Sequence, residues 1–310
     1  MASVPTASPY AVLIDRLVVR EASVAVLGVT TRYWDYGPLD AATTMIVVHG
    51  YRGDHHGLEP VIAQIDGIRI ISPDLPGFGA SDAFSDRAHD LEGYAMWLRH
   101  FAAALGMEQS AVILGHSFGS IVAAAAVAGG LSTPKLILIN PIARPALSGP
   151  NALMSKLTLF YYRSARALPA RIGRSLLSSW LVVRFMSVYL AQSRDASLRS
   201  WVHSQHHSYF SGYASRDSVI EGFQASITSD VSMFAPRITV PTLVIGADRD
   251  PITSADDQIR LAQLFADARL VMLHEVGHLV HYERPREAAE AIVAFLGAGR
   301  LVSSPSQESA

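Results

Sequence analysis

The sequence predicts an α/β fold in which a mostly parallel, eight-stranded sheet carries helices on both faces and a helical cap insertion. Two observations lead to this fold class. Short, continuous apolar runs alternate along the chain with longer segments of helical periodicity, as expected for parallel strands that are buried on both faces. One long stretch, residues 143–235, instead shows helical patterns without a convincing strand.

The expected strands and helices follow one another in regular order along the 310 residues. Strands are expected at residues 13–19, 24–36, 45–48, 68–72, 111–114, 135–139, 242–245 and 270–273. Helices are expected at residues 91–105, 117–128, 255–265 and 286–296. The helix at 91–105 is representative, because Ala95, Leu98, Ala102 and Leu105 recur at a spacing that places them on one face.

The same pattern divides the chain into four segments. Residues 1–142 and 236–298 form the two parts of the core, and residues 143–235 form a helical cap or lid inserted between two strands of the sheet. The last segment, 299–310, ends in a serine-rich sequence and is expected to be flexible.

Composition excludes several classes of function. The net charge of −2 gives no reason to expect nucleic acid as a partner, and the absence of cysteine excludes disulfides, a thiolate nucleophile and cysteine–zinc sites. The N-terminus lacks the features of a signal peptide, and no run reaches the roughly 18 apolar residues of a membrane span. We therefore expect a cytoplasmic protein that acts on a small molecule, as a monomer or a homodimer.

The most informative motif is a G-x-S-x-G sequence, GHSFG at 115–119. It follows an apolar strand and precedes a helix, which is the context that a nucleophile elbow requires. The flanking glycines avoid collisions with the neighbouring strand and helix, and the helix points its positive end at Ser117. The amide of Phe118 would then be one oxyanion donor, and His116 is expected to pack near the elbow.

A serine hydroxyl is a weak nucleophile, so it needs a general base, and the base needs a residue that orients it. Asp248 and Asp250 follow the strand expected at 242–245, and His278 follows the strand expected at 270–273. Each lies at the carboxyl end of a strand, where α/β sheets place their sites. The order serine, acid, histidine is the one that this elbow predicts.

Taken together, four sequence blocks resemble the α/β-hydrolase superfamily, in particular its capped, esterase-like serine hydrolases, over about residues 10–298. The blocks are HGYRG at 49–53, DLPGFGASD at 74–82, GHSFG at 115–119 and GHLVHYERP at 277–285. One departure is Ser120, where the family often has a second glycine. The serine is small, so we expect little consequence.

The resemblance implies a role for each residue of the site. His278 would be the general base, Asp250 the carboxylate that holds it, and the amides of Tyr51 and Phe118 the oxyanion hole. Asp250 is preferred to Asp248 because the acid of the family usually precedes a proline or an apolar residue. Triad acyl transfer needs neither metal nor nucleotide, so no cofactor is expected.

The aromatic content of the cap predicts an apolar or aromatic group in the substrate. The candidates for the pocket are Tyr51, Tyr161, Tyr162, Phe185 and Tyr189. Packing of cap helices on one another is the alternative explanation for these side chains. Arginines of the cap could instead favour an anionic substrate, although solvent exposure also explains them; they include Arg144, Arg163, Arg166 and Arg171.

Three functions remain open on sequence alone. Hydrolysis of a carboxylic ester is the first, and hydrolysis of a C–C bond in a dienoic keto acid, or a related lyase step, is the second. The second class often has Asn before the serine, where this chain has His116. The third is a ligand-binding protein with little turnover, which the intact triad disfavours. Epoxide hydrolases and haloalkane dehalogenases use Asp as nucleophile, so Ser117 argues against them.

Several further histidines need an interpretation. His203, His206 and His207 share helical spacing in the cap and could bind a metal, but we expect a polar cap face and no metal site. For His274 and His281 we expect structural roles. We expect His55 and His56 to lie near the predicted oxyanion loop, HGYRG at 49–53, without a catalytic role.

Overall fold

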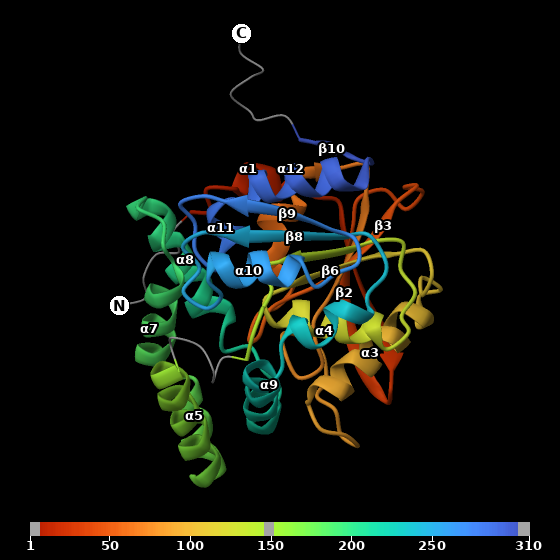
Figure 1. Cartoon of the computed structure of the whole chain (residues 1–310). Helices are drawn as coiled ribbons and strands as arrows, with labels where there is room; N and C mark the ends of the chain where they lie inside the picture. The colour runs from red at the N-terminus through yellow and green to blue at the C-terminus, as the bar shows by residue number, and fades with distance from the viewer. Residues whose placement is uncertain (1–6, 146–151, 303–310) are drawn as a thin grey trace.

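The computed structural model describes residues 7–145 and 152–302, and Figure 1 labels its helices and strands. Eight strands form one sheet in the order β1-β2-β5-β3-β6-β7-β8-β9. They are β1 Val19–Val26, β2 Val29–Tyr36, β3 Thr44–Val48, β5 Arg69–Pro73, β6 Val112–His116, β7 Leu136–Ile139, β8 Thr242–Ala247 and β9 Ala268–Leu273. Strand β2 is antiparallel to β1 and β5, and every other neighbouring pair is parallel. The predicted fold class is confirmed.

Helices cover both faces of the sheet, as Figure 1 shows with α12 above the strands and α3 and α4 below them. Alternate side chains of each strand enter two separate cores. Ile46 and Val48 of β3 lie in the core with α3 and α4, whereas Met45 and Val47 lie in the core with α2 and α12. The helices outside the insertion are α1 Ala11–Ile14, α2 Glu59–Ile62, α3 Leu91–Ala104, α4 Phe118–Ala128, α10 Ala255–Ala262, α11 Val280–Glu283 and α12 Pro285–Leu296.

The N-terminal region differs from the prediction. Residues 13–19 were expected to form a strand, but α1 ends at Ile14 and β1 begins only at Val19. The strand expected at 24–36 is instead the turn and second half of a hairpin, because Leu27 and Gly28 both have positive φ (52° and 80°). Such a two-residue turn matches the twist of the paired strands. A short apolar run is compatible with a strand or a helical turn, so its pattern could not decide between them.

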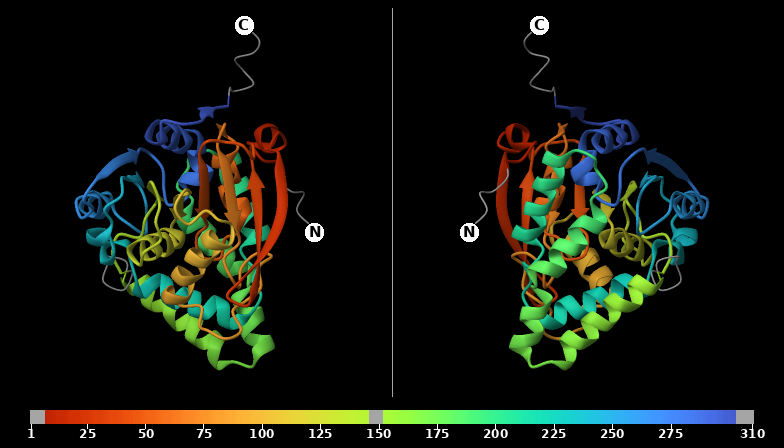
Figure 2. Two further views of the ribbon diagram at one scale, coloured as in Figure 1. Left: turned by 90° about the vertical axis from the view of Figure 1, so that its right-hand side faces the viewer. Right: turned by 90° about the vertical axis from the view of Figure 1, so that its left-hand side faces the viewer.

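The described residues between β7 and β8 form helices and loops, as expected, apart from one β-bridge between Tyr213 and Phe78. Its helices are α5 Ala152–Ala167, α6 Ala170–Leu177, α7 Trp180–Leu190, α8 Ala196–Tyr209 and α9 Arg216–Thr228. Figure 2 shows that the green helices of this insertion protrude from the lower end of the molecule. That the insertion acts as a cap with boundaries at 143 and 235 stays a prediction.

The C-terminal segment pairs with the core for a short distance. Strand β10 (Arg300–Leu301) is antiparallel to β4 (Ile65–Asp66), so our expectation of a flexible tail from residue 299 is wrong for these two residues. A strand of two residues leaves too little pattern to be recognised in a sequence. Residues 303–310 lie outside the described part. No helix in the described ranges is long and apolar enough to cross a membrane.

Candidate active site

A tight turn between β6 and α4 presents Ser117. The strand ends at His116, the helix begins at Phe118, and Ser117 between them has φ 53° and ψ −118°. A Cβ atom on Gly115 would lie 2.3 Å from the carbonyl oxygen of Gly119. One on Gly119 would lie 2.2 Å from the carbonyl oxygen of Val48. Both glycines are therefore required for the close approach of α4 to β6 and β3.

The structure brings together the three side chains of the predicted triad. His278 Nε2 lies 2.8 Å from Ser117 Oγ, and His278 Nδ1 lies 2.8 Å from Asp250 Oδ2. Ser117 follows β6, Asp250 follows β8 and His278 follows β9, so all three stand at the carboxyl ends of parallel strands. The imidazole is buried between its two partners.

The carboxylate of Asp250 is fully hydrogen-bonded. Its Oδ2 atom accepts from His278 Nδ1 and from Asn140 Nδ2, the latter at 3.1 Å. Its Oδ1 atom accepts from the amides of Ile252 (2.7 Å) and Thr253 (3.2 Å). These bonds fix the orientation of the buried carboxylate.

Asp248 has different surroundings. Its Oδ2 atom lies 3.2 Å from Nδ1 of His274, whose side chain is largely exposed. The structure thus places Asp250, and not Asp248, against His278.

Sequence reasoning did not identify Asn140. This residue directly follows β7, has φ 45°, and donates from Nδ2 to Asp250 Oδ2. Its Nδ2 atom also lies 3.4 Å from the carbonyl oxygen of Gly277, next to His278 in the sequence. Asn140 therefore ties the acid loop to the histidine loop. The available signal was its position at the carboxyl end of a predicted strand, shared with the other site residues.

The two main-chain amides that the sequence predicts for the oxyanion hole belong to different elements near Ser117. Phe118 supplies the first amide of α4, and Tyr51 lies on the loop after β3. That loop is close to the elbow, since a Cβ on Gly50 would lie 3.2 Å from Ser117 Cβ. Neither amide donates a hydrogen bond to any residue within 7–145 or 152–302. Tyr51 is held by its hydroxyl group, which donates to the carbonyl oxygen of Val219 at 2.7 Å.

Arg52, next to Tyr51, was not identified from the sequence as a site residue. It is buried, has φ 59°, and donates to the carbonyl oxygens of Phe210 and Leu177, both at 2.9 Å. Its Nη1 atom lies 3.5 Å from the hydroxyl group of Tyr162. No carboxylate forms an ion pair with Arg52 among the described residues. The loop after β3 is thus fastened to the ends of α6 and α8 by a guanidinium that has no carboxylate partner within the described ranges.

A cavity of about 580 Å³ lies over these residues. Ser117 and His278 are part of its wall, together with side chains from α5, α7 and α8. All five residues that the sequence predicted for the pocket line it; they are Tyr51, Tyr161, Tyr162, Phe185 and Tyr189. Arg52 lines it as well, and so does Arg144, which is paired with Asp257 at 3.2 Å. The wall is mostly apolar.

The alpha/beta hydrolase family matches residues 45–291, which is most of the chain. This chain belongs to that family. The match begins in β3 and ends within α12, so it includes the elbow, both partner loops and the whole insertion.

Known proteins similar to this hydrolase differ in their reactions. Lipase 3 of Moraxella sp. (strain TA144) is 20% identical over 251 residues, covering 81% of this chain and 76% of the lipase. A 2-hydroxy-6-oxononadienedioate/2-hydroxy-6-oxononatrienedioate hydrolase of Klebsiella pneumoniae is 23% identical over 273 residues, covering 83% and 88%. The solved structure of a thermophilic esterase from Thermogutta terrifontis has a TM-score of 0.72 at 21% identity, covering 90% of this hydrolase and 98% of the esterase. This likeness shows the fold alone.

Buried histidines surround His278. The imidazole of His116 lies 5.7 Å from that of His278 and 4.1 Å from that of His281. Burial, with the nearby imidazole of His278, lowers the pKa of His116 to about 3. Burial also lowers the pKa of His281, which lies near His116 and His206. These imidazoles are therefore neutral at pH 7, and they add no positive charge beside His278.

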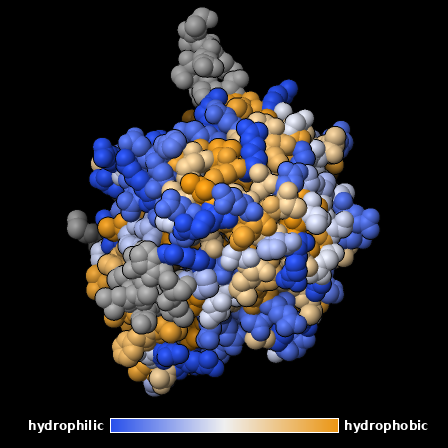
Figure 3. Space-filling model, viewed as in Figure 1, coloured by the Kyte–Doolittle hydropathy of each residue, from blue (hydrophilic) through white to orange (hydrophobic). Residues whose placement is uncertain are grey.

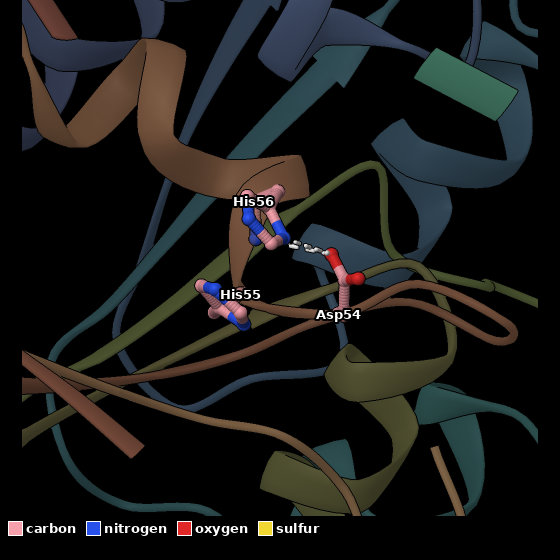
Figure 4. A group of neighbouring side chains, drawn as sticks. All are labelled: Asp54, His55 and His56. Atoms are coloured by element: carbon pink, nitrogen blue, oxygen red, sulfur yellow. Dashed lines mark hydrogen bonds and ion pairs between the residues drawn. The ribbon is translucent and has the colours of Figure 1, made fainter. Parts of the chain in front are cut away.

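The loop after Arg52 holds a second group of polar side chains, drawn in Figure 4. Asp54, His55 and His56 each have one potential metal-ligating atom, and these three atoms lie within 4.8 Å of one another. However, His55 Nδ1 lies 3.0 Å from Asp74 Oδ1, and His56 Nδ1 lies 3.2 Å from Asp54 Oδ1. Both rings are stacked, His55 on Trp34 and His56 on the Tyr209 of α8. We interpret these three side chains as a hydrogen-bonded group that holds the loop after β3 in place.

Our expectation of a polar face for the cap histidines is wrong for two of them. His203 and His206 are buried, and their Nδ1 atoms lie 2.6 Å and 2.7 Å from the hydroxyl oxygen of Ser187 on α7. His207 instead stacks on Trp180. A serine on one helix thus joins two histidines of the next. The helical spacing of histidines could not reveal a partner on another element.

Proposed function

We propose that this protein is a serine hydrolase that cleaves carboxylic esters through a Ser117–His278–Asp250 triad and an acyl-enzyme. The observation that carries the proposal is the pair of 2.8 Å contacts that link the serine hydroxyl group to the imidazole and the imidazole to the carboxylate. A serine, a base within hydrogen-bonding reach and a residue that orients the base are together sufficient for nucleophilic catalysis.

In this mechanism Ser117 attacks the ester carbonyl while His278 Nε2 takes the hydroxyl proton. Asp250 holds the Nδ1–H tautomer and stabilises the imidazolium that forms. The amides of Tyr51 and Phe118 donate to the tetrahedral oxyanion, aided by the N-terminal end of α4. His278 then protonates the departing alkoxide and activates the water that hydrolyses the acyl-enzyme.

The cavity supports an apolar or aromatic group in the substrate. Most of its aromatic lining residues come from the insertion, and Tyr51, Phe118 and Tyr282 add rings from the core, so aromatic side chains surround the position that the acyl or alcohol group would occupy. The volume of about 580 Å³ is in the range of cavities that enclose small organic ligands.

The first experiment compares the parent protein with Ser117→Ala. We expect the parent to hydrolyse p-nitrophenyl esters and to be labelled by a fluorophosphonate. The variant should remain folded and lose at least about 10⁴-fold in kcat, because the nucleophile is absent. Unlabelled parent protein without ester turnover would contradict the proposal and would favour a ligand-binding protein with little turnover. Normal turnover by Ser117→Ala would reject the nucleophile assignment.

A second candidate function is C–C bond hydrolysis of a dienoic keto acid. The observation that favours it is Arg52, a cavity-lining guanidinium without a carboxylate partner among the described residues. A substrate carboxylate would be the negatively charged partner that Arg52 lacks among the described residues. The Klebsiella relative named for a dienedioate substrate is consistent with such a ligand.

Matched substrates separate the two functions. We would assay neutral p-nitrophenyl esters against a dienoic keto acid, in the parent and in Arg52→Gln. A C–C hydrolase should cleave the keto acid, and Arg52→Gln should raise its KM much more than that of a neutral ester. Turnover of esters alone would leave ester hydrolysis as the function.

A further inference from the structure

The charges of the chain are distributed unevenly. Residues 141–194 contain eight Lys and Arg residues and no Asp or Glu. All 27 acidic residues therefore lie elsewhere, although the whole chain has a net charge of −2. This segment contains α5, α6 and α7, which the right-hand view of Figure 2 shows on the side of the molecule that faces the viewer.

The same helices expose large apolar side chains. All exposed Phe and Trp side chains of the described ranges lie here, namely Phe160, Trp180 and Phe185. Leu181, Phe185 and Val188 recur along α7 at helical spacing, so the outward stripe of this helix is apolar instead of polar. Figure 3 shows hydrophobic surface at the lower left, where Figure 1 places α5 and α7.

Basic side chains lie among these apolar ones. Arg163 and Arg166 on α5 and Arg171 on α6 are exposed, and none forms an ion pair with a carboxylate in the part of the chain that the structure describes. We call the exposed side chains of the three helices the basic–apolar face; it consists of Leu157, Phe160, Arg163, Arg166, Arg171, Ile172, Trp180, Leu181, Phe185 and Val188.

The basic–apolar face reaches the cavity of the candidate active site. Leu157 of α5 and Phe185 of α7 are each 55% exposed, and both also line the cavity that contains Ser117. These two side chains therefore stand at its mouth. A surface that contacts the face would lie directly over the route to the serine.

We propose that the basic–apolar face docks this protein onto an anionic lipid surface. Exposed Trp, Phe and Leu side chains enter the boundary between headgroups and acyl chains, and arginines beside them pair with anionic headgroups. Both kinds of side chain are present on α5 to α7, with no acidic side chain in this part of the sequence to repel the lipid. The mouth of the cavity then faces the lipid, from which an apolar substrate can enter.

The charges favour a lipid surface over a second copy of this chain. Self-association through the basic–apolar face would bring two sets of unpaired arginines together, and like charges in contact are unfavourable. An anionic bilayer instead offers the opposite charge along with an apolar interior.

Vesicle binding by the full-length Ser117→Ala variant tests the proposal without depending on the proposed chemistry. We expect co-sedimentation with vesicles of phosphatidylcholine mixed with phosphatidylglycerol, weaker binding to phosphatidylcholine alone, and weaker binding at high salt. Adding Arg163→Gln and Arg166→Gln should lower the partition coefficient about 30-fold. Adding Phe160→Ser and Leu181→Ser should lower it at least about tenfold.

Matched variants on other surfaces serve as controls. Arg16→Gln with Arg269→Gln, and Ile259→Ser with Leu264→Ser, change exposed side chains outside the basic–apolar face and should leave vesicle binding unchanged. Circular dichroism verifies that each variant is folded. The proposal is overturned if Ser117→Ala binds neither kind of vesicle, or if the control variants lose as much binding. Analytical ultracentrifugation without lipid gives a further test. If the protein forms dimers that Phe160→Ser and Leu181→Ser abolish, the face binds a second copy of this chain, and the proposal is overturned.

Discussion

At the scale of single residues, the clearest contrast is between two aspartates on one loop. Asp250 accepts hydrogen bonds from His278, Asn140 and two main-chain amides, whereas Asp248 contacts an exposed histidine. In the proposed mechanism, Asp250 and not Asp248 lies in place to stabilise the imidazolium that forms at position 278. That mechanism depends on which of two similar side chains the loop turns inward.

This contrast gives a direct prediction. Asp250→Asn should lower kcat by about 10³- to 10⁴-fold, because the amide cannot stabilise the imidazolium or hold the required tautomer. Asp248→Asn serves as the matched control and should change kcat by less than about threefold, since surface substitutions have small effects. Steady-state kinetics on a p-nitrophenyl ester measure both. Equal losses in the two variants would argue against Asp250 as the specific partner of His278.

Residues that belong to a local motif were accessible from the sequence, and residues defined by tertiary contacts were not. Ser117 stands in a five-residue pattern with a strand before it and a helix after it. Asn140 meets Asp250 from 110 positions away, and Arg52 meets Leu177 from 125 positions away. No local pattern encodes such contacts, so both residues appeared only with the fold.

At the scale of elements, the close packing of β3, β6 and α4 sets the position of the serine. The start of α4 lies so close to β3 that an added methyl group on Gly119 would overlap a main-chain oxygen. Main-chain atoms cannot move away as a flexible side chain can. The elbow is therefore intolerant of any side chain at this position.

Gly119→Ala should destabilise the protein by at least about 1–3 kcal/mol, because overpacking forces the helix and the strand apart. Gly57→Ala is a suitable control, since its Cβ would meet nothing nearer than the hydroxyl oxygen of Tyr282 at 3.7 Å. Urea unfolding of both variants gives the free energies. If Gly119→Ala were as stable as Gly57→Ala, the elbow would be less tightly packed than these distances indicate.

Buried strands were predictable to within a few residues, because short, continuous apolar runs that alternate with helical patterns are typical of parallel strands buried on both faces. The hairpin of β1 and β2 was less predictable. Its turn depends on the backbone conformation of Leu27 and Gly28, and only the glycine hints at it in the sequence.

At the scale of the whole molecule, buried histidines lie where the core and the insertion meet. His116 belongs to β6 and His206 to α8, yet both line the same cavity. Burial lowers the pKa of each to about 3. Between pH 6.5 and about 3, the unfolded chain therefore binds protons that the native protein does not. The free energy of unfolding falls progressively as the pH falls through this range.

We expect the free energy of unfolding at pH 5.5 to be lower by about 1.4 kcal/mol for each of these two histidines. His206→Gln should remove one such contribution, because glutamine does not titrate and can still bond to Ser187. His100→Gln, which changes an exposed histidine, should leave the pH dependence unaltered. Urea unfolding at pH 7.5 and 5.5 provides the comparison. An unchanged slope in His206→Gln would mean that His206 is protonated in the native protein.

The sheet and its helices could be predicted at this scale, but the arrangement of the insertion could not. Its helices pack through contacts such as those of Ser187 with His203 and His206, which depend on how α7 and α8 face each other. Sequence periodicity gives the helices and leaves their mutual orientation open.

The two ends of the insertion lie side by side. The amide of Val231, near the end of the insertion, bonds to the carbonyl oxygen of Ile142, just before its start, at 2.8 Å. The ends of the insertion are therefore already close together, and changing its length costs the sheet little chain entropy. Evolution, or a protein engineer, can exchange this segment for another of different size while the hydrogen-bonded scaffold underneath stays intact. Much of the cavity wall and the proposed catalytic groups are thus encoded in separable stretches of one gene.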